Sequence, residues 1–163
     1  MVATAAAIVQ PRSALLAKWD ALVTKPLGTT LFGRVLGFTV PYAATIAPEV
    51  LSLDVGRAHV RLGDRRRVRN HLGSIHAAAL TNLGELCANL ALTTRMPEDA
   101  RFIVRGMDIA FLKKARGRIE ARCEVAPLDW SVEQDPEGTA VLTDANGDEV
   151  ARLTVRWRTG PKR

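Results

Sequence analysis

The stretch Arg69–Leu92, RNHLGSIHAAALTNLGELCANLAL, is apolar and rich in small residues, and after its first residue it carries a single charged side chain, Glu85. From about Ile75 to Thr94 the apolar residues recur at helical spacing, and Pro97 closes the pattern. Because the polar residues are few and small, the predicted helix should be buried on most of its circumference. A carboxylate in such surroundings is costly to desolvate unless it is paired, protonated or reached by water, which makes Glu85 the first candidate functional residue.

On both sides of this helix the hydrophobic period changes to two, which predicts strands. Before it, Leu51, Leu53 and Val55 should share one face of a first strand. Residues 57–62 should return as the second strand of a hairpin. After the helix we predict four more strands: residues 102–112 with Gly106 at a bulge, residues 118–125, and the two arms of a hairpin about Asn146-Gly147 within residues 139–158.

Ahead of the first strand, residues 13–40 have a helical pattern that Pro26 and Gly28 interrupt, which predicts one helix, a break and a second short helix. The order is therefore helices, two strands, one buried helix and four strands. A mostly antiparallel sheet with one solvated face must cover its other face, and the central helix is the only element long enough to do so. The predicted fold is α+β: an antiparallel sheet wrapped around one apolar helix, which is the hotdog architecture.

A chain of 163 residues with 47% hydrophobic content is long enough for one structural domain. Within it we expect residues 1–40 to form an N-terminal helical extension and residues 41–160 to form the hotdog domain.

Residues 1–12 are interpreted as a frayed tail or a first helical turn, and their apolar run has no basic residue ahead of it, unlike a secretory signal. No stretch of 18 uncharged apolar residues is available to span a bilayer. We therefore expect a cytoplasmic protein without a membrane partner.

The cysteines and the net charge bear on whether the chain has a disulfide, a metal site or a nucleic-acid partner. Cys87 and Cys123 are interpreted as buried free thiols rather than a disulfide, and neither has a second Cys or a His at metal-ligand spacing, so no metal site is predicted. The net charge of +6 suits a nucleic-acid partner or one that bears phosphates. With 5% aromatic residues and no helix-turn-helix or RNP-like pattern, the chain has no element that reads bases, so we expect no nucleic-acid partner.

Helix geometry constrains the relation between Glu85 and His76. The two residues are nine positions apart, which places them about half a turn out of phase and about 13 Å apart along the axis. They cannot meet on one helix. If both belong to one site, Glu85 of one subunit must face the His76 end of another, and a two-fold dimer with antiparallel central helices supplies this arrangement twice.

Asn70, Gly73, Ser74, His76 and Glu85 fit the pattern N-x-x-G-[ST]-x-H with an acidic residue nine positions after the His. This pattern resembles the signature of the hotdog-fold acyl-CoA thioesterases, particularly the phenylacetic-acid-pathway (PaaI-like) group. The stretches PYAATIAPEVLSLDVGRAHVRL, RRRVRNHLGSIHAAALTNLGEL and FLKKARGRI resemble an uncharacterised branch in which the acid is Glu rather than Asp. The resemblance covers roughly residues 40 to 158.

The resemblance implies thioester hydrolysis without a cofactor other than the coenzyme A of the substrate. Glu85 would act as general base or nucleophile, with a raised pKa, while Asn70 and the backbone N–H of Ala77 would polarise the thioester carbonyl. His76 would position these groups. The site would lie at the subunit interface of a homodimer or of a homotetramer.

Two departures from the family weaken this assignment. The family more often has Gly where Ala77 stands, and some members have a hydroxyl where this chain has Val104. Thr81, one turn before Glu85, is a substitute for that hydroxyl, and the flanking Asn82 and Asn89 can support the carboxylate. The remaining substrate-binding candidates are Gly73 and Ser74, together with Lys113, Lys114, Arg116 and Arg67 for the phosphates of coenzyme A.

Each candidate also has a structural interpretation. Asn70 and His71 can simply close a loop and cap the helix, His76 can be a satisfied core histidine, and Glu85 can be half of a buried ion pair with an arginine of the sheet. The arginines are concentrated in two basic clusters, residues 61–69 and the C-terminal cluster at residues 153–163, and both can be solvated faces. Two other functions stay open: a non-catalytic acyl-CoA or acyl-carrier binding module, and a basic protein whose arginines bind nucleic acid.

Overall fold

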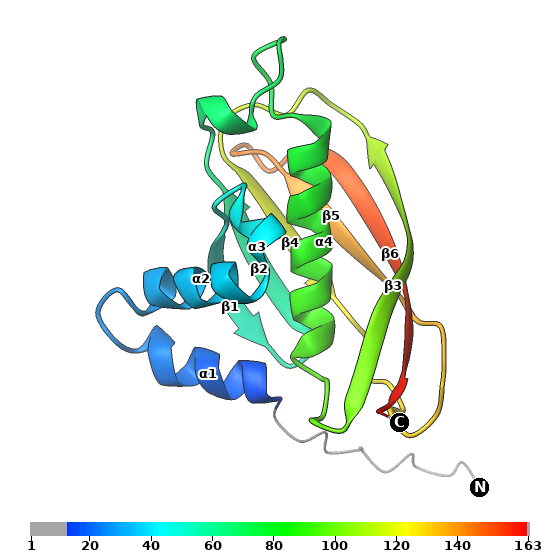
Figure 1. Cartoon of the computed structure of the whole chain (residues 1–163). Coiled ribbons are helices and arrows are strands. Elements are labelled where there is room, and N and C mark those ends of the chain that lie inside the picture. Colours follow the sequence, from blue (N-terminus) through cyan, green and yellow to red (C-terminus); the bar gives the residue numbers. More distant parts are fainter. Residues whose placement is uncertain (1–12, 163) are drawn as a thin grey trace, which may run out of the picture.

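The computed structural model describes residues 13–162, so the prediction for residues 1–12 lies outside the described residues. The elements follow the predicted order (Figure 1). They are α1 (Ala14–Val23), α2 (Gly28–Thr39), α3 (Pro41–Ala44), β1 (Glu49–Asp54), β2 (Arg57–Leu62), a 3-10 turn (Arg66–Val68), α4 (Ala77–Thr93), β3 (Ala100–Phe111), β4 (Ile119–Glu124), β5 (Glu137–Thr143) and β6 (Glu149–Pro161).

The six strands form one antiparallel sheet in the order β1-β2-β4-β5-β6-β3, with β1 and β3 at its edges. The hairpin turns contain Gly56 and Gly147, whose φ angles of +76° and +87° are conformations that glycine adopts without strain. The sheet curves around α4, which contacts β1, β2, β4, β5 and β6 (Figure 1). This arrangement confirms the hotdog fold.

The side of α4 that faces the sheet carries small residues, which allow the helix to approach closely. A Cβ added at Gly84 would lie 2.9 Å from Cδ2 of Leu153 on β6. One turn further, Cys87 is fully buried, and its Sγ lies 3.3 Å from the carbonyl oxygen of Ala121 on β4. Both cysteines are buried free thiols, as predicted. Burial raises the pKa of the Cys87 thiol well above its usual range and that of Cys123 to about 12.

The predicted strand faces are confirmed in β6 and wrong at one place in β1. Alternate residues of β6 from Ala151 to Trp157 are fully buried, and a register shift next to Gly106 confirms the bulge in β3. In β1 the buried residues are Val50 and Leu53, whereas Leu51 is half-buried. The register shifts between Val50 and Ser52, and such a bulge adds one residue, so the alternation changes face there.

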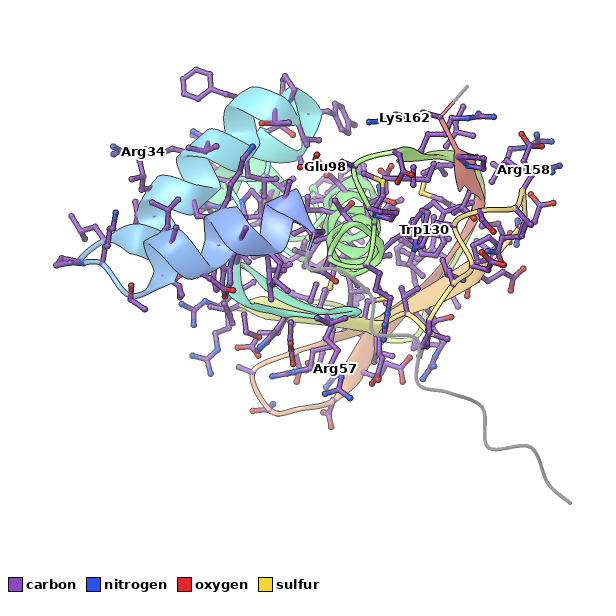
Figure 2. All side chains as sticks on the ribbon, turned by 90° about the horizontal axis from the view of Figure 1, so that it is seen from below. Arg34, Arg57, Glu98, Trp130, Arg158 and Lys162 are labelled. Carbon is purple, nitrogen blue, oxygen red and sulfur yellow. The ribbon has the colours of Figure 1, made fainter. Side chains whose placement is uncertain are left out.

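The helices α1 and α2 lie on the same side of the sheet as α4, and both contact β1 (Figure 2). They pack on each other through Trp19 and Phe32, whose rings meet edge to face with centroids 5.0 Å apart. These rings, with Leu16 and Leu36, belong to the hydrophobic core that also contains the sheet. The N-terminal helices therefore widen the layer that covers the concave face.

The opposite face of the sheet is charged and solvated, and Figure 2 shows Arg57 pointing into solvent there. The β6 arginines of the C-terminal cluster have nearby carboxylates: Arg156 pairs with Asp108, and Arg158 lies 2.9 Å from Asp135. The neighbouring Arg152 lies 2.8 Å from Glu149. A face in which positive and negative side chains alternate is a poor surface for a polyanion. This arrangement supports the interpretation of the C-terminal basic cluster as a solvated face.

Candidate functional site

The loop that leads into α4 is closed by Asn70. Its Oδ1 accepts hydrogen bonds from the backbone N–H of Leu72 (3.0 Å), the backbone N–H of Ser74 (3.2 Å) and the Ser74 hydroxyl (3.1 Å). Gly73 takes a φ of +69° in the same turn. The Ser74 hydroxyl is thus used inside the loop. With Oδ1 engaged in this way, the Nδ2 donor of Asn70 is left over, and no group among residues 13–162 accepts from it.

The same loop docks on the basic turn that follows β3. The backbone N–H of Ile75 donates to the carbonyl oxygen of Ala115 at 2.8 Å. Asp64 accepts from the backbone N–H of Gly117 at 3.0 Å and pairs with Arg69 at 2.6 Å. The hydrogen bond from Arg69 lowers the pKa of the Asp64 carboxyl below its usual range. Two loops that are far apart in the sequence therefore meet at the start of α4.

His76 is the N-cap of α4. Its Nδ1 accepts a hydrogen bond from the backbone N–H of Ala78 at 3.0 Å, and its side chain is exposed. The interpretation as a core histidine is therefore wrong. An Nδ1 that accepts a hydrogen bond carries no proton, so Nε2 carries the proton of the neutral ring and faces away from the helix backbone.

Ala77 is the first residue of α4, and its backbone N–H has no acceptor among the described residues. The first N–H groups of a helix lack intrahelical partners and lie at the positive end of the helix dipole. Ala77 and Asn70 line one cavity of about 380 Å³. Its other walls are Leu72, Ser74, Ile75, Leu80, Phe111, Leu112, Lys113, Lys114 and Ala115. We call it the donor cavity.

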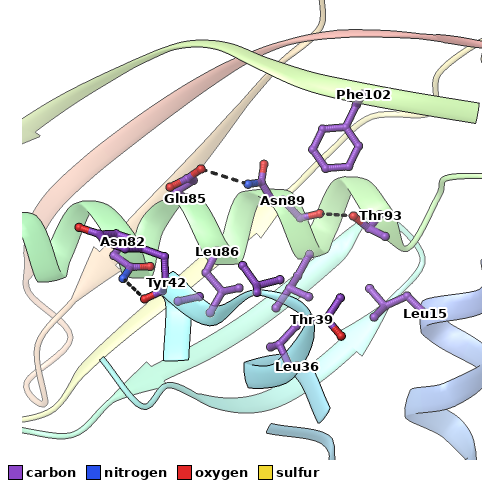
Figure 3. A pocket seen from close by; sticks show the side chains of 13 residues that line it. Leu15, Leu36, Thr39, Tyr42, Asn82, Glu85, Leu86, Asn89, Thr93 and Phe102 are labelled. Carbon is purple, nitrogen blue, oxygen red and sulfur yellow. Dashed lines mark hydrogen bonds between the residues drawn. The ribbon is translucent and has the colours of Figure 1, made fainter. Parts of the chain in front are cut away.

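Glu85 lines a different cavity, of about 430 Å³, whose walls come from α4, the N-terminal helices and β3 (Figure 3). The carboxylate is half-buried and forms no ion pair with any residue that the structure describes, so the ion-pair interpretation is wrong. The cavity is otherwise lined by Leu15, Leu36, Thr39, Val40, Tyr42, Ala43, Asn82, Leu86, Asn89, Leu90, Thr93 and Phe102. We call it the carboxylate cavity.

Asn89 links Glu85 to the core. The indole N–H of Trp157, which is fully buried, donates to Oδ1 of Asn89 at 2.7 Å. An indole N–H can only donate, so it fixes the carbonyl end of the amide and leaves Nδ2 to face Glu85. Nδ2 lies 3.5 Å from Oε1 of the carboxylate, one helical turn away (Figure 3). The predicted support by Asn89 is present, whereas Asn82 instead donates to the carbonyl oxygen of Tyr42 at 3.2 Å.

Within one chain the donors and the carboxylate lie in separate cavities. Ala77 and Glu85 are eight residues apart, which is about 12 Å along the helix. The structure therefore brings Asn70 and Ala77 together but does not bring either to Glu85. The interface with a second subunit stays a prediction.

The hydroxyl expected near the carboxylate is engaged elsewhere. The Thr81 hydroxyl donates to the carbonyl oxygen of Ala77 at 3.0 Å, and Val104 is partly buried and packs against the core. Neither residue lines the carboxylate cavity.

The predicted phosphate-binding residues fall into two groups. Lys113 lies 2.8 Å from Asp144 and 2.5 Å from Asp148, and the hydrogen bond to Asp144 is the main cause of its raised pKa. Lys114 lines the donor cavity, and its side chain has no partner among residues 13–162. Arg67 and Arg116 are exposed and also have no side-chain partner within that range.

Sequence reasoning missed the walls of the carboxylate cavity. Leu15 and Leu36 come from the N-terminal helices, and Phe102 comes from β3. Their apolar character fitted an ordinary core, so no sequence signal separated cavity residues from core residues. Trp157 was predicted to point inward, but its bond to Asn89 depends on a register that only the folded sheet defines.

Among the described residues, no group of three or more His, Cys, Asp or Glu side chains lies close enough to hold a metal ion. Helices long and apolar enough to cross a membrane are also absent from residues 13–162.

These features define a hotdog-fold protein with a donor-lined helix start and a carboxylate on the central helix. Residues 28–159 match the family model described as "Domain of unknown function (DUF4442)", and the chain belongs to this family. A structural-genomics target with 28% identity has a TM-score of 0.78, and the match covers 90% of this chain and 98% of that one.

Other solved structures share the fold at lower identity. A Pseudomonas aeruginosa protein of unknown function described as a "probable thioesterase" is 22% identical, with a TM-score of 0.70 over 81% of this chain and 95% of its own. A thioesterase-family protein from Silicibacter pomeroyi is 21% identical, with a TM-score of 0.68 over 79% and 96%. These likenesses confirm the fold. No curated protein matches the chain.

Proposed function

We propose that this chain is an acyl-CoA thioesterase whose active site is shared between the two subunits of a homodimer. The observation that carries the proposal is a pair of complementary features on α4. Backbone and amide N–H donors without partners among the described residues gather at its start, and a carboxylate without an ion pair among them lies about 12 Å further along the helix. Thioester hydrolysis needs one group of each kind.

The proposed reaction uses Glu85 as general base. The carboxylate takes a proton from water while the water oxygen bonds to the thioester carbon. The Ala77 N–H and Asn70 Nδ2 of the other subunit donate hydrogen bonds to the oxyanion. When the tetrahedral intermediate collapses, the C–S bond breaks and the thiol receives the proton back from Glu85. The departure is easy because the pKa of an ordinary thiol is only about 8.5.

The edge strand β3 supports the dimer. Ile103, Met107 and Phe111 on this strand are 58%, 40% and 50% exposed. A 12-residue edge with exposed apolar side chains is open to pairing with another chain. Pairing two β3 edges about a two-fold axis would set the α4 helices antiparallel and bring Glu85 of each subunit toward the donors of the other. Two such dimers would form the homotetramer.

The basic residues around the donor cavity suit coenzyme A. Lys114 lies in its wall, and Arg67 and Arg116 have guanidinium groups with no partner among the described residues. A guanidinium grips a phosphate through two N–H groups, whereas a lysine acts as a point charge.

The experiment that tests the proposal is subunit complementation between Glu85→Gln and Asn70→Ala. Each variant alone should lower kcat with an acyl-CoA by about 100-fold to 1000-fold. A mixture refolded together should recover about a quarter of the wild-type rate, because half of the random dimers are mixed and one of their two sites is intact. The exposed Glu98, in the turn after α4, provides the control Glu98→Gln, which should leave the rate within about twofold.

Two outcomes would contradict the proposal. An unchanged rate in Glu85→Gln would remove the general base. Loss of activity in both single variants with no recovery in the mixture would contradict the shared site, since a site within one chain cannot be restored by mixing.

A non-catalytic acyl-CoA binding module is the second candidate. The observation that favours it is that neither position expected to supply a hydroxyl to Glu85 does so: Thr81 donates to the carbonyl oxygen of Ala77, and position 104 is valine. In that case acyl-CoA esters would raise the Tm of the wild-type chain without being hydrolysed.

A further inference from the structure

The carboxylate cavity is mostly apolar and contains one charged group. That group is Glu85, which lies between Asn82 and Asn89 on α4 (Figure 3). From Glu85 to Thr93 the cavity follows α4 for eight residues, or about 12 Å. Along this length the walls are mostly aliphatic or aromatic side chains from all four helices and from β3. A mostly apolar cavity with one carboxylate toward one end suits a ligand that has one reactive polar group and an apolar tail.

The size of the cavity limits that ligand. A cavity of about 430 Å³ lies within the range of about 300–1,000 Å³ that is typical of small-molecule sites. A short acyl group such as acetyl or butyryl would leave most of this apolar surface in contact with water. A linear acyl group of about a dozen carbons would cover more of these walls.

The N-terminal helices decide where the cavity ends. Next to the carboxylate cavity, a further cavity of about 470 Å³ lies between α1 and α2. It is lined by Lys18, Ala21, Leu22, Phe32 and Val35. Leu15, Leu36 and Thr39 line both cavities. These three side chains therefore stand at the junction, where the size of each one sets how far a bound chain can extend.

We propose that the carboxylate cavity binds a linear apolar acyl chain, with its carbonyl end at Glu85, and that Leu15, Leu36 and Thr39 of the N-terminal helices limit its length. This proposal rests on the proposed function in that it takes the ligand to be the acyl part of a thioester. It adds the substrate class, a medium-to-long-chain fatty acyl ester, and it assigns chain-length selection to a part of the molecule outside the sheet and central helix.

Binding to the Glu85→Gln variant tests the proposal without requiring turnover. Dodecanoyl-CoA should bind at least about tenfold more tightly than butyryl-CoA, because each additional buried CH₂ strengthens binding. The affinity for dodecanoate, which lacks coenzyme A, is measured alongside, and its comparison with dodecanoyl-CoA distinguishes an acyl-CoA site from a free fatty-acid site. Equal affinity for the two CoA esters would overturn the proposal.

Substitutions at the junction locate the acyl chain. Thr39 is exposed on α2, so Thr39→Phe should fold, fill the junction and weaken dodecanoyl-CoA binding by at least about tenfold while leaving butyryl-CoA within about twofold. The matched control is Thr30→Phe, an exposed position on the same helix that lines neither cavity. Leu15→Ala should join the two cavities and move the preference toward hexadecanoyl-CoA. If neither variant changes the preference, the N-terminal helices do not select chain length.

The two proposals fail in different ways. If dodecanoyl-CoA binds tightly but the wild-type chain does not hydrolyse it, the acyl site stands and the thioesterase does not. If the wild-type chain hydrolyses short and long esters with equal kcat/KM, the thioesterase stands and the acyl site does not.

Discussion

The two cavities beside α4 are built in different ways. The polar groups of the donor cavity are held by residues that are close in the sequence. Asn70 closes a loop of five residues, and His76 caps the helix by accepting a hydrogen bond from Ala78, two residues later. The carboxylate cavity joins α1, α2, α3, α4 and β3, and its amide is oriented by Trp157, which is 68 residues away from Asn89. Donors at a helix start follow from local backbone geometry, whereas the surroundings of a carboxylate on the same helix require the whole fold.

Outside Glu85 and Asn70, the largest effect is expected at the link between the carboxylate and the core. Asn89→Asp keeps the acceptor for Trp157 but replaces the N–H that faces Glu85 with a negative charge. Hydrolysis should fall by about 10-fold to 100-fold, and the acidic limb of the pH–rate profile should move to higher pH. The pH dependence of kcat/KM measures this, with the Tm as a check on folding. If the acidic limb of the pH–rate profile does not move, Asn89 supports the fold rather than the carboxylate.

A smaller effect is expected at the basic turn of the donor cavity. Lys114→Ala should raise KM for acyl-CoA by about threefold to tenfold with little change in kcat, and the difference should shrink at high salt. Lys113→Ala is the matched control, because Lys113 is already held by Asp144 and Asp148. Steady-state kinetics at two ionic strengths distinguish the two lysines. A larger KM effect from Lys113 would reverse this assignment.

The helix cap should contribute stability of about 1 kcal/mol. His76→Ala removes the acceptor for the Ala78 N–H and should lower the free energy of unfolding by that amount. His76→Asn supplies a side-chain oxygen at the same position and should restore it. Urea unfolding measures both variants. If His76→Asn is as unstable as His76→Ala, the role of His76 is not capping.

The smallest effect is a pH dependence at the loop contact. The hydrogen bond from Arg69 holds the folded-state pKa of Asp64 below its unfolded value of about 3.9. The stabilisation is therefore present above the unfolded pKa and is lost as the pH falls through the folded pKa. Asp64→Asn should be less stable than wild type near pH 7, by an amount that shrinks near about pH 3. A difference that is constant with pH would contradict this linkage.

Much of the fold was predictable because each element carries a local signal. Apolar residues at spacing two gave the strands, the Asn146-Gly147 turn gave the last hairpin, and the apolar helical run gave α4. Leu51 was placed on the wrong face because a bulge depends on the pairing of two strands, and an alternating sequence does not reveal it.

The candidate site was predictable in its residue types and less so in their contacts. Glu85 stood out as the single carboxylate of an apolar helix, and Asn70 and Ala77 were assigned from the family resemblance. The helical spacing required that His76 and Glu85 lie apart on the helix. Lys113 looked as available as Lys114, because its two carboxylate partners lie more than 30 residues away. A charged side chain in a turn carries no local signal of the partner that engages it.

The sequence by itself determined the sheet wrapped around α4, the donors at the helix start and the single carboxylate in the buried helix. These features depend on periodicity, helix geometry and the nearest few residues. Only the tertiary structure decided that the carboxylate opens into a cavity walled by α1 and α2, and that the indole of Trp157 orients Asn89. Such features arise from packing between distant segments, where apolar side chains that line a cavity are chemically the same as those that fill a core.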